Sequence, residues 1–286
     1  MKSYKIIIAT MLLLIACVGC PDSYARYHCS ADTSKVMGLV REFYSPGGDP
    51  GEIAGKIAEA LKETPYEEVV MNDSVGHILV KADGFDNITF LDMVSAIARL
   101  ATSPGHKRIN EFERELENIS YRRGEDNGFP SKMIYISDWI VDNKARNNVK
   151  EITENYSDQF RTKSLEKVSR NRDLYAALKD SSCYEGQKMV EMGFRTHKVP
   201  HLKREQASRK EITDEMRDGD IVVMLTSDPM TDALETGFVR EREDGFHFIH
   251  PSVEAGKVVE EDEPLDRYIK RNAKRIYGWR WVRLSK

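Results

Sequence analysis

The stretch best placed to do chemistry is Gly84 to Asp92, where an apolar segment gives way to an amphipathic one. Apolar residues recur at helical spacing from Phe90 to Leu100. Asp86 suits the N-cap of this helix, because a short acceptor side chain satisfies free backbone N–H groups. The first turn lies at the positive end of the helix dipole, which lowers the pKa of a thiol placed there. The pattern is therefore typical of a cysteine nucleophile, yet the stretch contains no cysteine.

The elements around this stretch predict an α+β fold. Apolar periodicity indicates helices at 34–44, 51–64, 109–119 and 133–143, with a short strand near residue 79. After Asp218 the period changes, and we expect strands at 221–225, 236–241, 245–250, 256–260 and 279–284, with a helix at 265–270. The N-terminal helices should therefore pack on a mostly antiparallel C-terminal sheet.

The chain predicts one domain, from about residue 30 to 286. Residues from about 155 to 215 are highly charged and weakly periodic, with helical pieces such as 173–179. No linker composition brackets this segment, so we interpret it as an elaboration of the domain.

The first 20 residues have the form of a signal peptide. Lys2 and Lys5 precede an apolar run that is too short to span a bilayer. Residues 14–17 (Leu-Ile-Ala-Cys) look like a lipobox, which favours lipidation of Cys17 over plain secretion. Cleavage before Cys20 or after Ala25 remains open. Either route predicts an exported protein, periplasmic or held at a bacterial membrane by lipid.

Composition excludes a nucleic-acid partner. The formal net charge is −4, and phosphate binding needs a clustered positive field. The basic runs are interpreted as solvated faces, since acidic residues lie close to each of them: 203–204, 209–210 and 271–275. An exported chain could pair Cys29 with Cys183, although two free thiols fit equally well.

Four segments resemble the NlpC-type, papain-like cell-wall amidases, in particular the N-acetylmuramoyl-L-alanine amidases that act on muropeptides. The resemblance runs from about residue 30 to the C-terminus. Its segments are Asp86 to Asp92, 131–140 with Asp142 and Asn143, the strand start at 218–221, and 232–238 together with 248–252. Each motif alone is weak, and their order and spacing together carry the resemblance.

The resemblance implies a site whose chemistry has changed. It places Asn87 at the nucleophile position and Glu235 at the general-base position, while His250 keeps the orienting position. A thiol relay needs a thiolate and an imidazole, so an active cysteine amidase is not expected. Two other family positions also differ, since Lys132 stands for an arginine and Ile134 for a histidine.

The resemblance also gives a set of candidate ligand-binding residues: Asp86, Asn87, Lys132, Tyr135, Asp138, Trp139, Asp232, Glu235 and His250. Each has an ordinary structural alternative, such as helix capping for Asn87 or core packing for Trp139 and His250. Glu235 and His250 could also ligate a metal, but we predict no metal and no cofactor.

We therefore expect a catalytically inactive homologue that binds a muropeptide, or a related glycan or peptide, in the former active-site cleft. One alternative is a hydrolase that uses carboxylate or metal chemistry in the same cleft. Another is a scaffold protein whose cleft is vestigial and whose 155–215 segment binds a partner.

Overall fold

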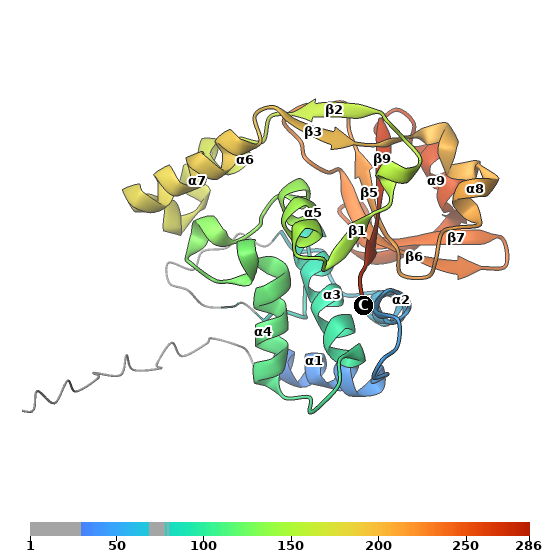
Figure 1. The fold of residues 1–286 in the computed structure, drawn as a ribbon, viewed down its shortest axis with the longest axis horizontal. Coiled ribbons are helices and arrows are strands. Elements are labelled where there is room, and N and C mark those ends of the chain that lie inside the picture. The colour runs from blue at the N-terminus through green and yellow to red at the C-terminus, as the bar shows by residue number, and fades with distance from the viewer. Residues whose placement is uncertain (1–29, 69–77, 79) are drawn as a thin grey trace, which may run out of the picture.

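The structure is a computed structural model that describes residues 30–68, 78 and 80–286. Helices come first along the chain (Figure 1): α1 (Ser30–Glu42), α2 (Pro50–Ala60), α3 (Asn87–Thr102), α4 (Ile109–Ser120) and α5 (Ile136–Ala145). Strands follow, namely β5 (Ile221–Leu225), β6 (Glu235–Arg242), β7 (Gly245–Ser252), β8 (Lys257–Pro264) and β9 (Gly278–Leu284), with α9 (Leu265–Arg271) between the last two. The predicted α+β order is confirmed.

The main sheet is antiparallel at every pairing. Within the described ranges it has seven strands, in the order β1-β9-β5-β6-β7-β8, with β4 (Leu202–Lys203) also paired to β9. The edge strand β1 (Val149–Glu151) was not predicted, because three residues are too few for a period to show. The C-terminal strand thus lies inside the sheet, next to β5.

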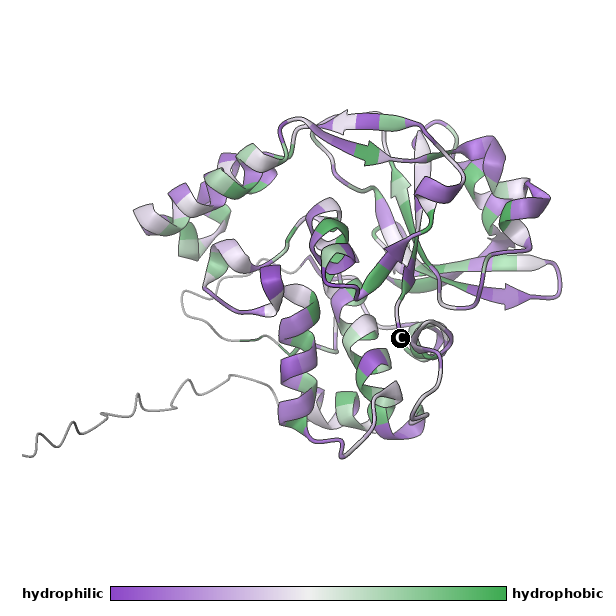
Figure 2. Ribbon diagram, viewed as in Figure 1, coloured by the Kyte–Doolittle hydropathy of each residue, from purple (hydrophilic) through white to green (hydrophobic). Residues whose placement is uncertain are grey.

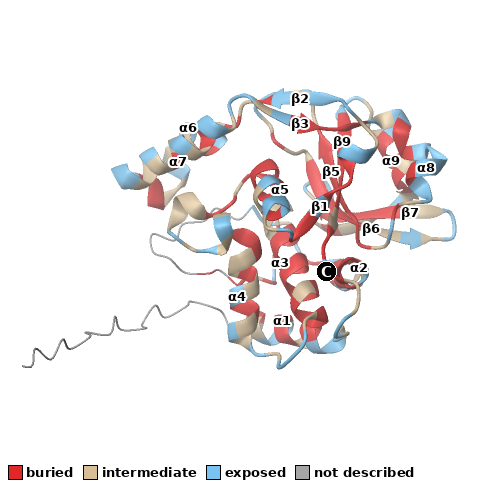
Figure 3. Cartoon of the chain, viewed as in Figure 1, coloured by how far each residue is buried: buried red, intermediate tan, exposed pale blue. Residues whose placement is uncertain are grey.

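Both faces of the sheet are covered. Ile221, Val223 and Leu225 pack in one core with the N-terminal helices, whereas Val222 and Met224 pack in a second core with α9. This explains why β5 is a continuous apolar run rather than an alternating one. The hydrophobic and buried residues concentrate accordingly in α3 and the central strands (Figures 2 and 3).

The turn before β5 is built for close approach to α2. Gly219 has φ +74°, and a Cβ at this position would lie 1.6 Å from the carbonyl oxygen of Gly51. Asp220 is buried and accepts hydrogen bonds from the indole of Trp281 and the guanidinium of Arg283. The Asp218 to Ile221 motif is therefore explained by folding alone.

The charged segment forms several small elements. They are β2 (Phe160–Lys163), α6 (Lys167–Arg170), α7 (Ser181–Gly193), β3 (His197–Pro200), β4 and α8 (Lys210–Thr213). The helix expected at 173–179 is instead two 3-10 turns, Arg172–Leu174 and Ala176–Lys179. In Figure 1, α6 and α7 extend away from the sheet and lie on the side of α5.

Two further expectations differ from the structure in part. The helix expected from 133 begins three residues later, at Ile136, because the 3-10 turn Phe129–Ser131 and an extended segment precede it.

The strand expected near residue 79 includes Leu79, which lies outside the described residues, as do the signal segment, Cys17, Cys20 and Cys29. Cys183 is a half-buried free thiol. No helix in the described part is long and apolar enough to cross a membrane.

Candidate functional site

The site is organised around the N-terminus of α3. Asp86 caps the helix as predicted: its carboxylate accepts from the backbone N–H of Thr89 at 2.9 Å, and the Thr89 hydroxyl accepts from the N–H of Asp86 at 3.0 Å. This reciprocal capping box fixes the direction in which the chain enters the helix. Phe90, one turn further, packs edge-to-face on Phe238 of β6 with ring centroids 5.8 Å apart. The helix start is thereby held against the sheet.

Asn87 links this helix start to the first residues of β6. Its side-chain amide donates to the carbonyl oxygen of Leu234 at 3.3 Å, and its carbonyl oxygen accepts from the N–H of Thr236 at 3.1 Å. The two bonds lie on either side of Glu235. Asn87 and Glu235, which are 148 positions apart in the chain, therefore meet at one site.

Glu235 is held by two groups from the end of the chain. The hydroxyl of Tyr268 donates to Oε2 at 2.6 Å, and Arg275 contacts Oε1 at 3.0 Å. Burial and the neighbouring Glu235 charge both raise the pKa of Tyr268, so the phenol stays protonated and remains a donor. Both oxygens of the Glu235 carboxylate therefore accept hydrogen bonds within the protein, and the bond from Arg275 is charge-assisted.

His250 is buried rather than on the surface. Its ring is 1% exposed and stacks on Phe248 with centroids 4.6 Å apart. Nε2 is 3.0 Å from the carboxylate of Glu261. Gly237 makes this packing possible, because a Cβ there would lie 2.0 Å from the carbonyl oxygen of Ile249 and 2.8 Å from the Cβ of His250.

Two cavities open beside Asn87, which lines both of them. The larger one, of about 1380 Å³, contains Glu235, Tyr268 and Arg275 in its walls and is called the charged cleft below. The smaller one, of about 260 Å³, lies on the α5 side and is called the inner cavity. Its walls include five of the expected ligand-binding residues: Asp86, Asn87, Lys132, Tyr135 and Asp232.

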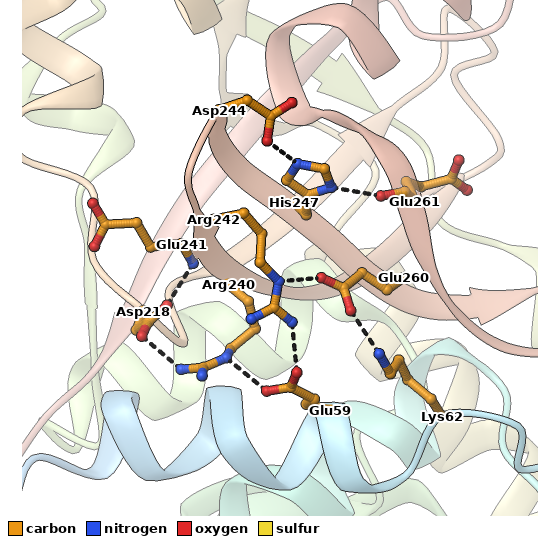
Figure 4. Close-up of polar contacts among 10 residues, drawn as sticks. All are labelled: Glu59, Lys62, Asp218, Arg240, Glu241, Arg242, Asp244, His247, Glu260 and Glu261. Carbon is orange, nitrogen blue, oxygen red and sulfur yellow. Dashed lines mark hydrogen bonds and ion pairs between the residues drawn. The ribbon is translucent and has the colours of Figure 1, made fainter.

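Figure 4 shows ion pairs that join the end of α2 and the following residues to β6 and β8, and Lys62, Arg242 and Glu260 of this network line the charged cleft. Arg242 bridges Glu59 and Glu260 at 2.6 Å each, and Lys62 reaches Glu260 at 2.7 Å. Burial works to raise the pKa of Glu260, but the bonds from Arg242 and Lys62 outweigh it and hold that pKa at about 2. This wall is therefore ionised at neutral pH and fixed in place.

Trp139 and Asp138, two further residues of the expected set, make buried polar contacts. Trp139 is fully buried and its indole N–H donates to Asp92 at 2.9 Å. Asp92 in turn pairs with Lys132 at 2.6 Å. Asp138 pairs with Arg122, and burial raises the pKa of Asp138 to about 6 although Arg122 opposes the shift. Trp139, Asp138 and His250 are buried and line neither cavity, so their contact with a ligand stays a prediction from the resemblance.

Tyr135 is positioned by the charged segment. Its hydroxyl donates to Glu191 of α7 at 2.7 Å and accepts from the backbone N–H of Val168 at 3.0 Å. The same Glu191 oxygen accepts from the N–H groups of Val168 and Ser169. Glu191 is 2% exposed. The segment that the sequence marks only as an elaboration therefore forms part of the inner cavity.

Sequence reasoning missed several residues of the site. Tyr66, Lys167 and Tyr175 line the inner cavity, and Tyr268 and Arg275 hold Glu235. Arg275 belongs to a basic run that we interpreted as a solvated face. None of these residues lies in a motif, and no local pattern would have marked them. The described residues contain no group of three or more His, Cys, Asp or Glu side chains that could hold a metal ion.

The fold and site define an α+β protein of amidase type, in which a helix N-terminus meets a strand at a polar cleft. The chain belongs to the N-acetylmuramoyl-L-alanine amidase-like family, whose profile matches residues 56–276. No curated protein sequence matches it.

Solved structures share the fold across most of the chain. An N-acetylmuramoyl-L-alanine amidase from Bacteroides uniformis is 24% identical with a TM-score of 0.72, over 84% of this chain and 100% of that one. A putative xylanase from Bacteroides fragilis is 26% identical with a TM-score of 0.69, over 80% and 100%. A Legionella pneumophila protein is 17% identical with a TM-score of 0.65, over 90% and 95%. At these identities the first and third likenesses establish the fold alone.

Proposed function

We propose that this protein is a non-hydrolytic, papain-like relative of the cell-wall amidases that binds muropeptides in the former active-site cleft. The observation that carries the proposal is the engagement of Asn87 and Glu235. Both ends of the Asn87 amide bind the backbone around Glu235, and Glu235 itself is bound by Tyr268 and Arg275. A side-chain amide is not a nucleophile at neutral pH, and these bonds use it to join two elements.

The two cavities support binding of an elongated ligand that carries both sugar and peptide. The charged cleft offers ionised groups of both signs, and the inner cavity combines apolar walls from Ile88, Ile134 and Ala233 with polar and charged side chains. Small-molecule sites combine these features, with apolar walls for affinity and few polar groups for orientation. Asn87 stands where the two cavities meet.

The proposed location is the cell envelope. The signal segment and the lipobox-like residues 14–17 support export and a lipid anchor on Cys17. The family supports the same place, because its peptidoglycan substrates lie there.

The test is incubation of residues 21–286 with purified muropeptides, followed by mass spectrometry of the solution and of the washed protein. We expect retained muropeptide and no cleavage products. Tyr175→Ala and Lys167→Ala, in the wall of the inner cavity, should lower retention. The matched changes Tyr44→Ala and Lys150→Ala, at exposed residues outside these cavities, should leave it unchanged.

Glu235→Gln separates the proposal from the hydrolase alternative. Cleavage by the natural sequence that this substitution abolishes would overturn the proposal, because it would assign acid–base chemistry to Glu235. Absence of both cleavage and retention would also overturn it and would favour the scaffold alternative.

A further inference from the structure

A third cavity lies outside both the charged cleft and the inner cavity. It measures about 310 Å³ and is bounded by the segment from His201 to Glu205 and by the turn from Ala273 to Tyr277 that follows α9. These segments are about 70 residues apart in the sequence. Each was interpreted as a solvated basic face, and the fold brings the two runs together.

Basic side chains outnumber acidic ones around this cavity, although the whole chain is acidic and Arg275 is paired with Glu235. Lys203, Arg204, Lys274 and Arg275 lie in its walls, opposed by Glu205. Glu205 is exposed, and the shortest distance between its carboxylate and the guanidinium of Arg204 is 3.9 Å, which makes this a long ion pair. Lys203 and Lys274 are exposed and form no ion pair with any described residue. Their charges are therefore available to a ligand.

Arg204 and Arg275 are held in fixed positions by other groups. The guanidinium of Arg204 donates to the carbonyl oxygens of Ala273 and Ile276, which ties the two segments together. Arg275 is held by Glu235 at 3.0 Å. Two guanidinium groups that are held by other groups, beside two exposed ammonium groups, provide donors for an anion.

His201 adds a buried polar atom that lacks a partner. The residue is 3% exposed and lines the cavity, and its Nδ1 has no hydrogen-bond partner among the described residues. Its ring packs on Tyr277 with centroids 5.1 Å apart. The guanidinium of Arg161 lies over the ring of Tyr277, 4.3 Å from its centroid. The buried Nε of Arg161 also has no hydrogen-bond partner in the described part of the chain. Buried polar atoms are normally hydrogen-bonded, and a ligand in this cavity would supply a partner for the ring of His201.

We propose that this cavity binds a phosphate group. Phosphate offers acceptor oxygens in several directions at once, which matches ammonium and guanidinium donors that arrive from two separate segments. A planar carboxylate would reach fewer of them. The group could come from free phosphate or from a phosphodiester such as a lipid headgroup, and both present the same oxygens.

The test is isothermal titration of residues 21–286 at constant ionic strength with two probes, inorganic phosphate and glycerophosphoglycerol. We expect saturable one-site binding of at least one probe. Tighter binding of the diester would assign the site to headgroup-type phosphates, and tighter binding of inorganic phosphate would assign it to the free ion. Acetate at the same ionic strength should bind at least tenfold more weakly.

The double variant Lys203→Gln/Lys274→Gln should weaken phosphate binding at least tenfold. It removes two exposed charges, so folding should be unaffected. The matched control Lys150→Gln/Lys179→Gln makes the same charge change at exposed lysines elsewhere. The proposal is overturned if neither probe binds saturably, or if the two double variants bind phosphate equally well.

Discussion

The side chain of Asn87 brackets Glu235, donating to the carbonyl oxygen before it and accepting from the N–H after it. The position where the amidase-like resemblance expects a nucleophile is thus a joint between α3 and β6. Glu235 points instead toward Tyr268 and Arg275, which come from the last 20 residues of the chain. Four predictions follow from this arrangement and from the network around it.

Asn87→Ala should lower the free energy of unfolding by about 1–3 kcal/mol, because it leaves a backbone carbonyl and an N–H at a part-buried joint without their partner. Chemical denaturation measures this. The matched change Asn171→Ala removes an exposed side-chain bond to the carbonyl of Lys167 and should cost less than about 0.5 kcal/mol. Equal losses in the two variants would contradict the joint assigned to Asn87.

Asn87→Cys should produce a reactive thiol, because the position is the first residue of a 16-residue helix and the dipole favours the thiolate. In a Cys29→Ser/Cys183→Ser background, we expect its pKa to lie below the ordinary value of about 8.5. The pH dependence of iodoacetamide alkylation measures this.

The control is a protein whose single cysteine is Cys183. Burial and the nearby Asp180 raise the pKa of Cys183, so it should react more slowly at pH 7. Equal rates for the two thiols would show that the start of α3 does not activate a thiol at position 87.

Glu260 should make stability depend on pH in the acid range. Its pKa is about 2 in the folded chain, against the ordinary value of 4.5 for a glutamate in an unfolded chain. Between these two pH values the unfolded chain therefore binds more protons. The contribution of the Arg242–Glu260–Lys62 contacts is therefore full above pH 4.5 and is lost as the pH falls toward 2. Thermal unfolding of the natural sequence and of Glu260→Gln should differ most near neutrality and converge at low pH. A constant difference would show that protonation of Glu260 is not responsible.

The buried pair between Glu151 and Arg280 should be a sensitive point of the fold. Both side chains are at most 2% exposed, and Arg280 also reaches the hydroxyl of Ser137, which in turn donates to Asp232 of the inner cavity. Glu151→Gln leaves a buried guanidinium without a counter-charge, and we expect a loss of about 3–5 kcal/mol.

Glu154→Gln is the matched change three residues away. It breaks an exposed pair with Lys144 and should cost about 0–1 kcal/mol. Urea denaturation of the two variants compares them directly, and similar losses would mean that the Glu151–Arg280 pair is dispensable.

The sequence by itself determined the local structure around Asn87. The apolar spacing after Phe90, the short acceptor at Asp86 and the continuous run of β5 are local patterns, and each produced the expected element. The order of helices and strands likewise predicted the α+β class. These features follow from backbone hydrogen bonding and from the period of side chains along one element, which a single chain displays directly.

Only the tertiary structure decided which polar residues face a cavity. Trp139 and His250 occupy motif positions but are turned into the core, whereas Tyr175, Tyr268 and Arg275 lie in no motif and reach the site. The two basic runs near His201 and Tyr277 meet because β4 pairs with β9 and because Arg204 bonds to the turn after α9. Such relations depend on how distant elements pack, and the energy that fixes them comes from burial summed over the whole core rather than from any local pattern.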